Sequence, residues 1–104
     1  MLSIKKEDTT LAYADEGSST TVAPMVLVHG WGCDHTSLKA QADYFSRTRR
    51  VVSLDLRGHG ESDAPDEGYT MAGYAADVAW LCAALGLHKP VMVGHSMGSN
   101  IHCP

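Results

Sequence analysis

Residues 91–98 read Val-Met-Val-Gly-His-Ser-Met-Gly, a short apolar run followed by a serine between two glycines. The apolar run 91–93 is typical of a strand that is buried on both faces of a parallel sheet. Gly94 and Gly98 lack the side chains that would clash in a sharp turn around Ser96. The stretch therefore predicts a strand, a tight turn and the start of a helix, with the Ser96 hydroxyl exposed in the turn.

Two earlier stretches repeat the strand pattern: the apolar run 25–28, and the start of the stretch Arg-Val-Val-Ser-Leu-Asp-Leu-Arg-Gly-His-Gly at 50–60. Between the runs, apolar residues recur at spacings of three and four over 36–46 and 71–85, which predicts two helices that each pack one face on a sheet. Strands that alternate with helices indicate right-handed crossovers and parallel pairing. The pattern thus predicts an α/β fold with a mostly parallel sheet.

The predicted helices have recognisable ends. Asp34 or Thr36 is expected to cap the first helix and Thr70 the second, while Gly86 can adopt the left-handed conformation that ends a helix. The residues expected on the apolar faces are Leu38, Ala42 and Phe45 in the first helix, and Met71, Tyr74, Ala75, Val78, Leu81, Cys82 and Leu85 in the second.

The N-terminal segment shows a different pattern. Apolar residues at 2, 4, 11 and 13 alternate with polar ones around Glu7-Asp8, which predicts an antiparallel hairpin with one solvated face. With 104 residues and no visible linker or repeat, residues 1–104 are expected to belong to one domain.

Charge and composition exclude several classes of partner. Eight basic and twelve acidic residues give a net charge of −4, so no basic field is expected to attract nucleic acid or anionic lipid. The cluster of Arg47, Arg49 and Arg50 is interpreted as a solvated loop after a helix. The first ten residues contain no apolar run of a signal peptide or a membrane span. Three cysteines without framework spacing indicate reduced thiols, so the expected location is cytoplasmic.

Three motifs in this order resemble the α/β-hydrolase superfamily: His-Gly-Trp-Gly at 29–32, Asp-Leu-Arg-Gly-His-Gly-Glu-Ser-Asp at 55–63, and Gly-His-Ser-Met-Gly at 94–98. The resemblance covers nearly the whole chain. It implies that Ser96 is a catalytic nucleophile and that the backbone N–H groups of Trp31 and Met97 form an oxyanion hole.

The same resemblance implies roles for neighbouring residues. Gly94, His95 and Gly98 would shape the turn around the nucleophile, and His29, Gly30 and Gly32 would shape the oxyanion loop. Arg57, His59 and Asp63 of the second motif would be scaffold rather than catalysts.

A serine nucleophile implies acyl transfer, whereas dehalogenases and epoxide hydrolases of this fold use an aspartate at that position. The expected activity is hydrolysis of a small carboxylic ester or related acyl compound through an acyl-enzyme, without a cofactor. No dinucleotide or phosphate-binding glycine motif is present. The residues His29, Cys33, Asp34 and His35 do not have a recognised metal-ligand spacing, so no metal is expected.

The acid and base of such an enzyme follow the nucleophile in this superfamily, and the chain ends before either is expected. His102, six residues after Ser96, would lie about 9 Å along a helix and about 240° around it, which is out of hydrogen-bond reach. The chain is therefore interpreted as the N-terminal part of a hydrolase domain that lacks the later strands and the cap, and is expected to be nearly inactive alone. Two alternatives stay open. One is a non-catalytic protein that self-associates or binds a partner through an exposed strand, and the other is a cofactor-free perhydrolase that uses the same serine.

Overall fold

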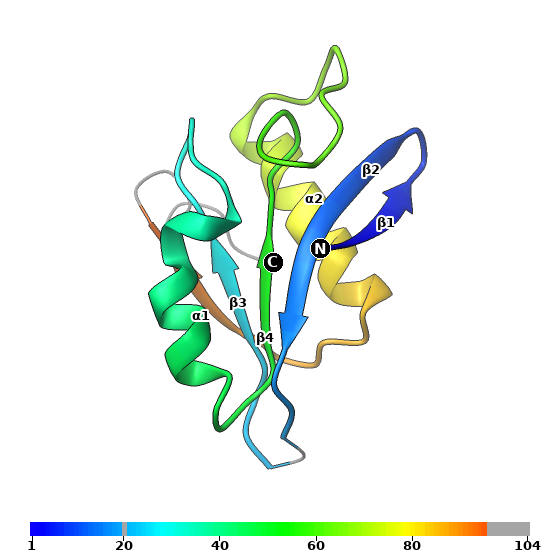
Figure 1. Ribbon diagram of the computed structural model, residues 1–104. Helices are drawn as coiled ribbons and strands as arrows, with labels where there is room; N and C mark the ends of the chain where they lie inside the picture. The colour runs from blue at the N-terminus through cyan, green and yellow to red at the C-terminus, as the bar shows by residue number, and fades with distance from the viewer. Residues whose placement is uncertain (20, 96–104) are drawn as a thin grey trace.

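The computed structural model describes residues 1–19 and 21–95 (Figure 1). Five strands form one sheet in the order β1-β2-β4-β3-β5. Strands β1 and β2 form an antiparallel hairpin, β2 pairs antiparallel with β4, and β3 pairs in parallel with both β4 and β5. The strands are β1 Leu2–Lys6, β2 Thr9–Glu16, β3 Met25–Val28, β4 Val51–Leu54 and β5 Val91–Gly94.

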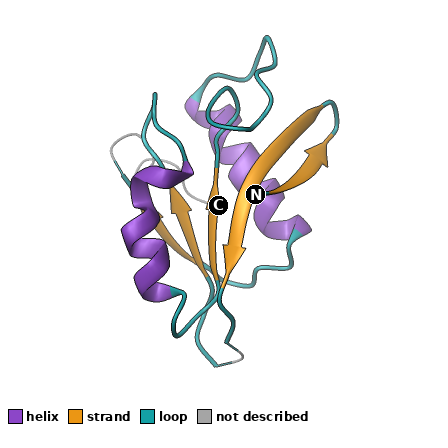
Figure 2. Cartoon of the chain, in the orientation of Figure 1, coloured by secondary structure: helices purple, strands orange, loops and turns teal. Residues whose placement is uncertain are grey.

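The helices are the short 3-10 helix η1 His35–Leu38, followed directly by α1 Lys39–Phe45, and α2 Met71–Ala84. Figure 2 shows α1 and α2 on opposite sides of the sheet. The predicted α/β fold with an N-terminal hairpin is confirmed. Neither α1 nor α2, nor any other helix in the described part of the chain, is long and apolar enough to cross a membrane.

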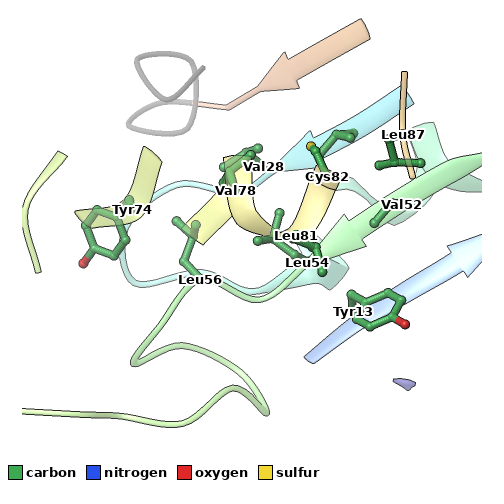
Figure 3. Packing of buried hydrophobic residues seen from close by; sticks show 11 residues of the cluster. Tyr13, Val28, Val52, Leu54, Leu56, Tyr74, Val78, Leu81, Cys82 and Leu87 are labelled. Carbon is green, nitrogen blue, oxygen red and sulfur yellow. The ribbon is translucent and has the colours of Figure 1, made fainter. Parts of the chain in front are cut away.

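Successive side chains of the central strands point to opposite faces of the sheet, so the core has two parts, one under each helix. Val26 and Val28 of β3 join Val52 and Leu54 of β4 in the cluster under α2 (Figure 3). The intervening residues of the same strands, among them Leu27, face α1 instead. Because successive side chains of a strand point to opposite faces, a strand between two helices must be apolar at every position. All four residues of β3 are buried accordingly.

The predicted helix caps are present. The Asp34 side chain accepts a hydrogen bond from the Thr36 N–H, and Thr70 accepts one from the Gly73 N–H. Gly86 has a φ of 68°, as expected at a helix end. Met71 differs from the prediction: it is 41% exposed, because it stands in the first turn and α2 packs on the sheet from Tyr74 onward.

The interpretation of the arginine cluster as a solvated loop is wrong for two of its three members. The Arg50 guanidinium donates two hydrogen bonds, at 2.9 and 2.7 Å, to the Asp15 carboxylate, and so joins the end of β2 to the start of β4. Arg49 donates to the Ala23 carbonyl. Only tertiary proximity supplies these acceptors, since Arg50 and Asp15 are 35 residues apart.

Strand β5 lies at the edge of the sheet that the described residues form, and its Val91 is exposed. An apolar edge at this strand agrees with the sequence analysis. Self-association through the edge stays a prediction.

A buried ion pair ties the segment after β4 to α2. The Arg57 Nε and Nη2 atoms donate to the two oxygens of the Asp77 carboxylate at 2.6 and 2.7 Å, and Lys6 Nζ donates to the same carboxylate at 2.9 Å. Burial acts to raise the pKa of Asp77, but the hydrogen bonds from Arg57 and Lys6 outweigh burial and hold this pKa below its usual value. The carboxylate therefore stays charged at neutral pH.

The substitution Asp77→Ala is expected to lower the free energy of unfolding by about 3 kcal/mol, because Arg57 and Lys6 lose their shared buried acceptor. Urea denaturation measures this loss. Asp43→Ala is the matched control: it removes the exposed ion pair with Lys39, which solvent screens, and is expected to leave stability almost unchanged. Equal losses in the two variants would contradict a structural role for the buried pair.

Candidate active site

Two loops follow the parallel strands at the same edge of the sheet. Residues 29–34 after β3 form the β3 loop, and residues 55–63 after β4 form the β4 loop. A cavity of about 850 Å³ lies between them. Its lining includes Trp31 and Asp34 from the β3 loop, His59 from the β4 loop, and Tyr69 beyond it. Ligands of α/β folds bind outside the carboxyl ends of the strands, so this edge is the candidate site.

Strand β5 brings the chain to the same edge. Gly94 ends β5 in register with Val28, and the His95 N–H donates to the Val28 carbonyl at 3.1 Å. His95 itself is exposed. Ser96, Met97 and Gly98 lie outside the described residues, so the predicted nucleophile turn is described only up to His95. The residue before Ser96 thus stands beside the start of the β3 loop.

His29 is 1% exposed and both of its ring nitrogens are engaged. Its Nδ1 lies 2.7 Å from the Gly30 carbonyl oxygen, and its Nε2 accepts a hydrogen bond from the Leu56 N–H at 3.0 Å. Because Nε2 is the acceptor, the proton must be on Nδ1, which donates to Gly30. Burial lowers the pKa of His29, so the ring is neutral at pH 7. Through these two bonds His29 joins the β3 loop to the β4 loop, while its role in shaping an oxyanion loop stays a prediction.

Trp31 and Gly32 form the exposed part of the β3 loop. The Trp31 residue is 72% exposed, and the Cys33 N–H closes the turn by donating to the Gly30 carbonyl at 3.1 Å. Gly32 has a φ of 82°, a backbone conformation that favours glycine. Within residues 1–19 and 21–95 the Trp31 N–H has no hydrogen-bond acceptor.

His59 is brought to the same loop, a contact that the sequence analysis did not predict. Its Nε2 accepts a hydrogen bond from the Gly32 N–H at 2.9 Å, and its Nδ1 lies 3.0 Å from the Arg57 carbonyl oxygen. The ring centroids of His59 and His29 are 5.0 Å apart. The interpretation of His59 as scaffold did not identify its partner, because Gly32 lies 27 residues earlier.

Asp55 is the second residue whose role the sequence analysis missed. Its buried carboxylate accepts hydrogen bonds through Oδ1 from the N–H and Nδ1 of His35 and through Oδ2 from the Glu61 N–H. A charged residue directly after a buried strand was the available signal, because a fully buried carboxylate requires several donors. Asp55 thus joins the start of η1 to the β4 loop.

The remaining candidate residues do not assemble into a metal site in the part of the chain described here. Within it, no three His, Cys, Asp or Glu side chains gather where they could hold an ion. The Nδ1 of His35 is directed at Asp55, and the Asp34 carboxylate caps η1.

A sheet with parallel central strands, helices on both faces and a cavity at the carboxyl ends of the strands defines an α/β protein with a candidate ligand site at that edge. A family model described as "alpha/beta hydrolase fold" matches residues 23–103, and the chain belongs to this family. The resemblance recognised from the three motifs is thereby confirmed.

The proteins similar to this chain are named as several kinds of enzyme. The chain is 42% identical over 95 residues to a non-heme chloroperoxidase of Streptomyces lividans, a match that covers 90% of this chain and 34% of the relative. Among solved structures, it resembles a thermophilic esterase from Thermogutta terrifontis (TM-score 0.82, 39% identity, covering 93% and 36% of the two chains). It also resembles the enol-lactonase from Burkholderia xenovorans LB400 (TM-score 0.84, 32% identity, covering 93% and 38%). Other relatives are named epoxide hydrolases. The chain spans about a third of the length of the chloroperoxidase, the esterase and the lactonase, and 22% of the length of the two epoxide hydrolases.

The lowered pKa of His29 predicts a loss of stability in mild acid. Below its usual pKa of about 6.5, the unfolded chain binds a proton at His29 that the folded chain does not bind, so the free energy of unfolding falls as the pH falls. Urea denaturation from about pH 8 to about pH 5 measures this slope. The variant His29→Gln, which cannot titrate, is expected to show a shallower slope over this range. An unchanged slope would contradict the burial of a neutral imidazole.

Two glycines of the site offer a matched comparison. A Cβ at Gly60 would collide with the Asp55 carboxylate, whereas nothing lies within 4 Å of a Cβ at Gly32, and both residues have positive φ. Gly60→Ala is therefore expected to lower the free energy of unfolding by about 2 kcal/mol more than Gly32→Ala. Thermal and urea unfolding of both variants test this difference, and equal losses would show that Asp55 can move without cost.

Proposed function

We propose that residues 1–104 form the nucleophile-bearing part of a single α/β-hydrolase domain that hydrolyses small acyl esters through Ser96. The observation that supports this best is the hydrogen bond from the His95 N–H to the Val28 carbonyl, because it brings the residue before Ser96 beside the β3 loop. The Trp31 N–H of that loop has no acceptor among the described residues, as an oxyanion donor requires.

In this proposal the Ser96 hydroxyl attacks the carbonyl carbon of the ester and gives its proton to a base. The carbonyl oxygen becomes an oxyanion that accepts hydrogen bonds from the Trp31 and Met97 N–H groups. The alcohol leaves with the proton, and water then attacks the acyl-enzyme and releases the carboxylic acid. A serine at position 96 favours this acyl chemistry over the aspartate-based chemistry of epoxide hydrolases. The names of the esterase and lactonase relatives agree with an ester substrate.

Four of the five described histidines offer no base for Ser96, and the fifth, His95, is expected to direct its ring away from the turn. Both ring nitrogens of His29 and of His59 have partners in the two loops, and His35 is bonded to Asp55. His88 precedes β5 and lies at the opposite end of that strand from His95. Without an imidazole beside it, a serine hydroxyl is a weak nucleophile at neutral pH. Residues 1–104 alone are therefore expected to react slowly with esters.

A cofactor-free perhydrolase is the second candidate, and the name of the Streptomyces lividans relative favours it. The same acyl-enzyme would then be attacked by hydrogen peroxide in place of water, which yields a peracid. Formation of a peracid that depends on both Ser96 and hydrogen peroxide, at a rate above that of ester hydrolysis, would favour this candidate.

The test is a chimera in which residues 1–104 replace the matching segment of the Thermogutta terrifontis esterase, so that the remainder of that enzyme supplies the later residues. We expect the chimera to hydrolyse a simple aryl acetate and to react with a fluorophosphonate probe. The variant Ser96→Ala is expected to lower turnover at least about 1,000-fold, because the nucleophile is lost.

Ser3, an exposed serine of β1 outside the lining of this cavity, gives the matched control, and Ser3→Ala is expected to retain turnover. The chain of 104 residues, assayed beside the chimera, is expected to react far more slowly with the probe. A folded chimera whose turnover survives Ser96→Ala would contradict the proposed nucleophile.

A further inference from the structure

The β3 and β4 loops exchange hydrogen bonds through two histidine rings. His29 of the β3 loop accepts from the Leu56 N–H of the β4 loop, and His59 of the β4 loop accepts from the Gly32 N–H of the β3 loop. Each ring also has its Nδ1 beside a backbone carbonyl of its own loop. The two bonds differ in one respect: His29 is buried, while the bond from Gly32 to His59 lies at the exposed part of the site.

We infer that His59 is a positioning residue: it holds the peptide between Trp31 and Gly32, and thereby helps to keep the adjacent peptide, which carries the Trp31 N–H, in the orientation an oxyanion donor needs. This inference rests on the proposed function, because it takes Trp31 as the donor. His59 does not touch the substrate in this role. It acts through the backbone of the β3 loop.

Packing alone does not hold this part of the loop. Trp31 is 72% exposed, and no described atom other than its chain neighbours lies within 4 Å of the position that a Gly32 Cβ would occupy. The constraints on residues 30–33 include the bonds that the Gly30 carbonyl accepts from the Cys33 N–H and from His29 Nδ1, the bond from Gly32 to His59, and an edge contact between the Trp31 and His59 rings at 6.2 Å. Two of these four involve His59, and they are the two that reach Trp31 and Gly32.

The groups around His59 determine which of its ring nitrogens carries the proton and which one accepts a hydrogen bond. The Arg57 carbonyl accepts from Nδ1, so the lone pair stays on Nε2, where Gly32 donates. Arg57 is itself fixed, since its guanidinium binds Asp77 and the Glu67 carbonyl. The Tyr74 ring of α2 contacts the His59 ring edge-on at 6.3 Å. The acceptor atom is therefore held in place from the α2 side of the molecule.

Two substitutions separate the two ring nitrogens of His59. A glutamine side chain places an amide group near the position of Nε2 and can still accept from Gly32 through its oxygen. An asparagine places its amide near the position of Nδ1 and does not reach Gly32. His59→Gln should therefore keep the loop contact, and His59→Asn should lose it. His88→Asn, at an exposed histidine, controls for the loss of an imidazole elsewhere.

Nuclear magnetic resonance of the 104-residue chain tests the contact directly. We expect His59 to carry its proton on Nδ1, and the Gly32 amide to exchange with solvent about fivefold faster in His59→Asn than in the unsubstituted chain, which corresponds to about 1 kcal/mol. His59→Gln and His88→Asn are expected to leave this rate unchanged. The Leu27 amide of β3 should be unaffected in all variants, which a general loss of structure would not allow.

Turnover in the chimera supplies the second readout. Because an oxyanion donor acts in the transition state, His59→Asn is expected to lower kcat about tenfold with little change in KM, and His59→Gln to restore most of it. A His59 proton on Nε2, an unchanged Gly32 exchange rate in His59→Asn, or equal kcat values in the two variants would each overturn the inference.

Failure of the proposed function gives a different result. The amide measurements need no ester turnover, so Ser96→Ala is expected to leave the Gly32 exchange rate unchanged. A chimera without Ser96-dependent turnover would contradict the proposed nucleophile and the donor role of Trp31, while the contact between His59 and Gly32 would still be measured in the chain itself.

Discussion

The buried carboxylate of Asp55 is the constraint on which the site depends. A charge without solvent contact is tolerated only where several donors converge on it, and here the N–H and ring of His35 and the Glu61 N–H supply them. Those donors come from the entrance to η1 and from the far side of the β4 loop. Because both segments donate to the Asp55 carboxylate, they are held at fixed positions where the parallel strands end. Gly60 has no side chain, and a Cβ there would collide with the Asp55 carboxylate.

The two loops add their own mutual bonds to this arrangement. Each of His29 and His59 uses one ring nitrogen within its own loop and the other across to its neighbour. An imidazole suits this task because it is both donor and acceptor in its neutral form. The result is a site whose histidines serve as structural acceptors. This agrees with a proposed chemistry in which the base lies elsewhere. The Trp31 N–H has no acceptor in the described part of the chain.

Much of the fold could be predicted from the sequence, because its signals are local. Four consecutive apolar residues at 25–28 required helices on both faces of the strand, and the caps at Asp34, Thr70 and Gly86 follow from the chemistry of those side chains alone. Where the prediction was wrong, the partner was distant. From the sequence, Arg50 was interpreted as a solvated charge, but in the structure its guanidinium donates to Asp15 of the neighbouring strand β2.

The existence of the strands and helices, the helix caps, the three motifs and the identity of the nucleophile candidate Ser96 follow from the sequence by itself, since each depends on residues close together in the chain. Only the tertiary structure decided which polar groups meet at the site. Leu56 with His29, Gly32 with His59, and His35 with Asp55 are pairs separated by 20 to 27 residues. The distances between the members of these pairs are set by the spacing and direction of neighbouring strands. A buried donor or acceptor forms its hydrogen bond with the group that this geometry places within reach.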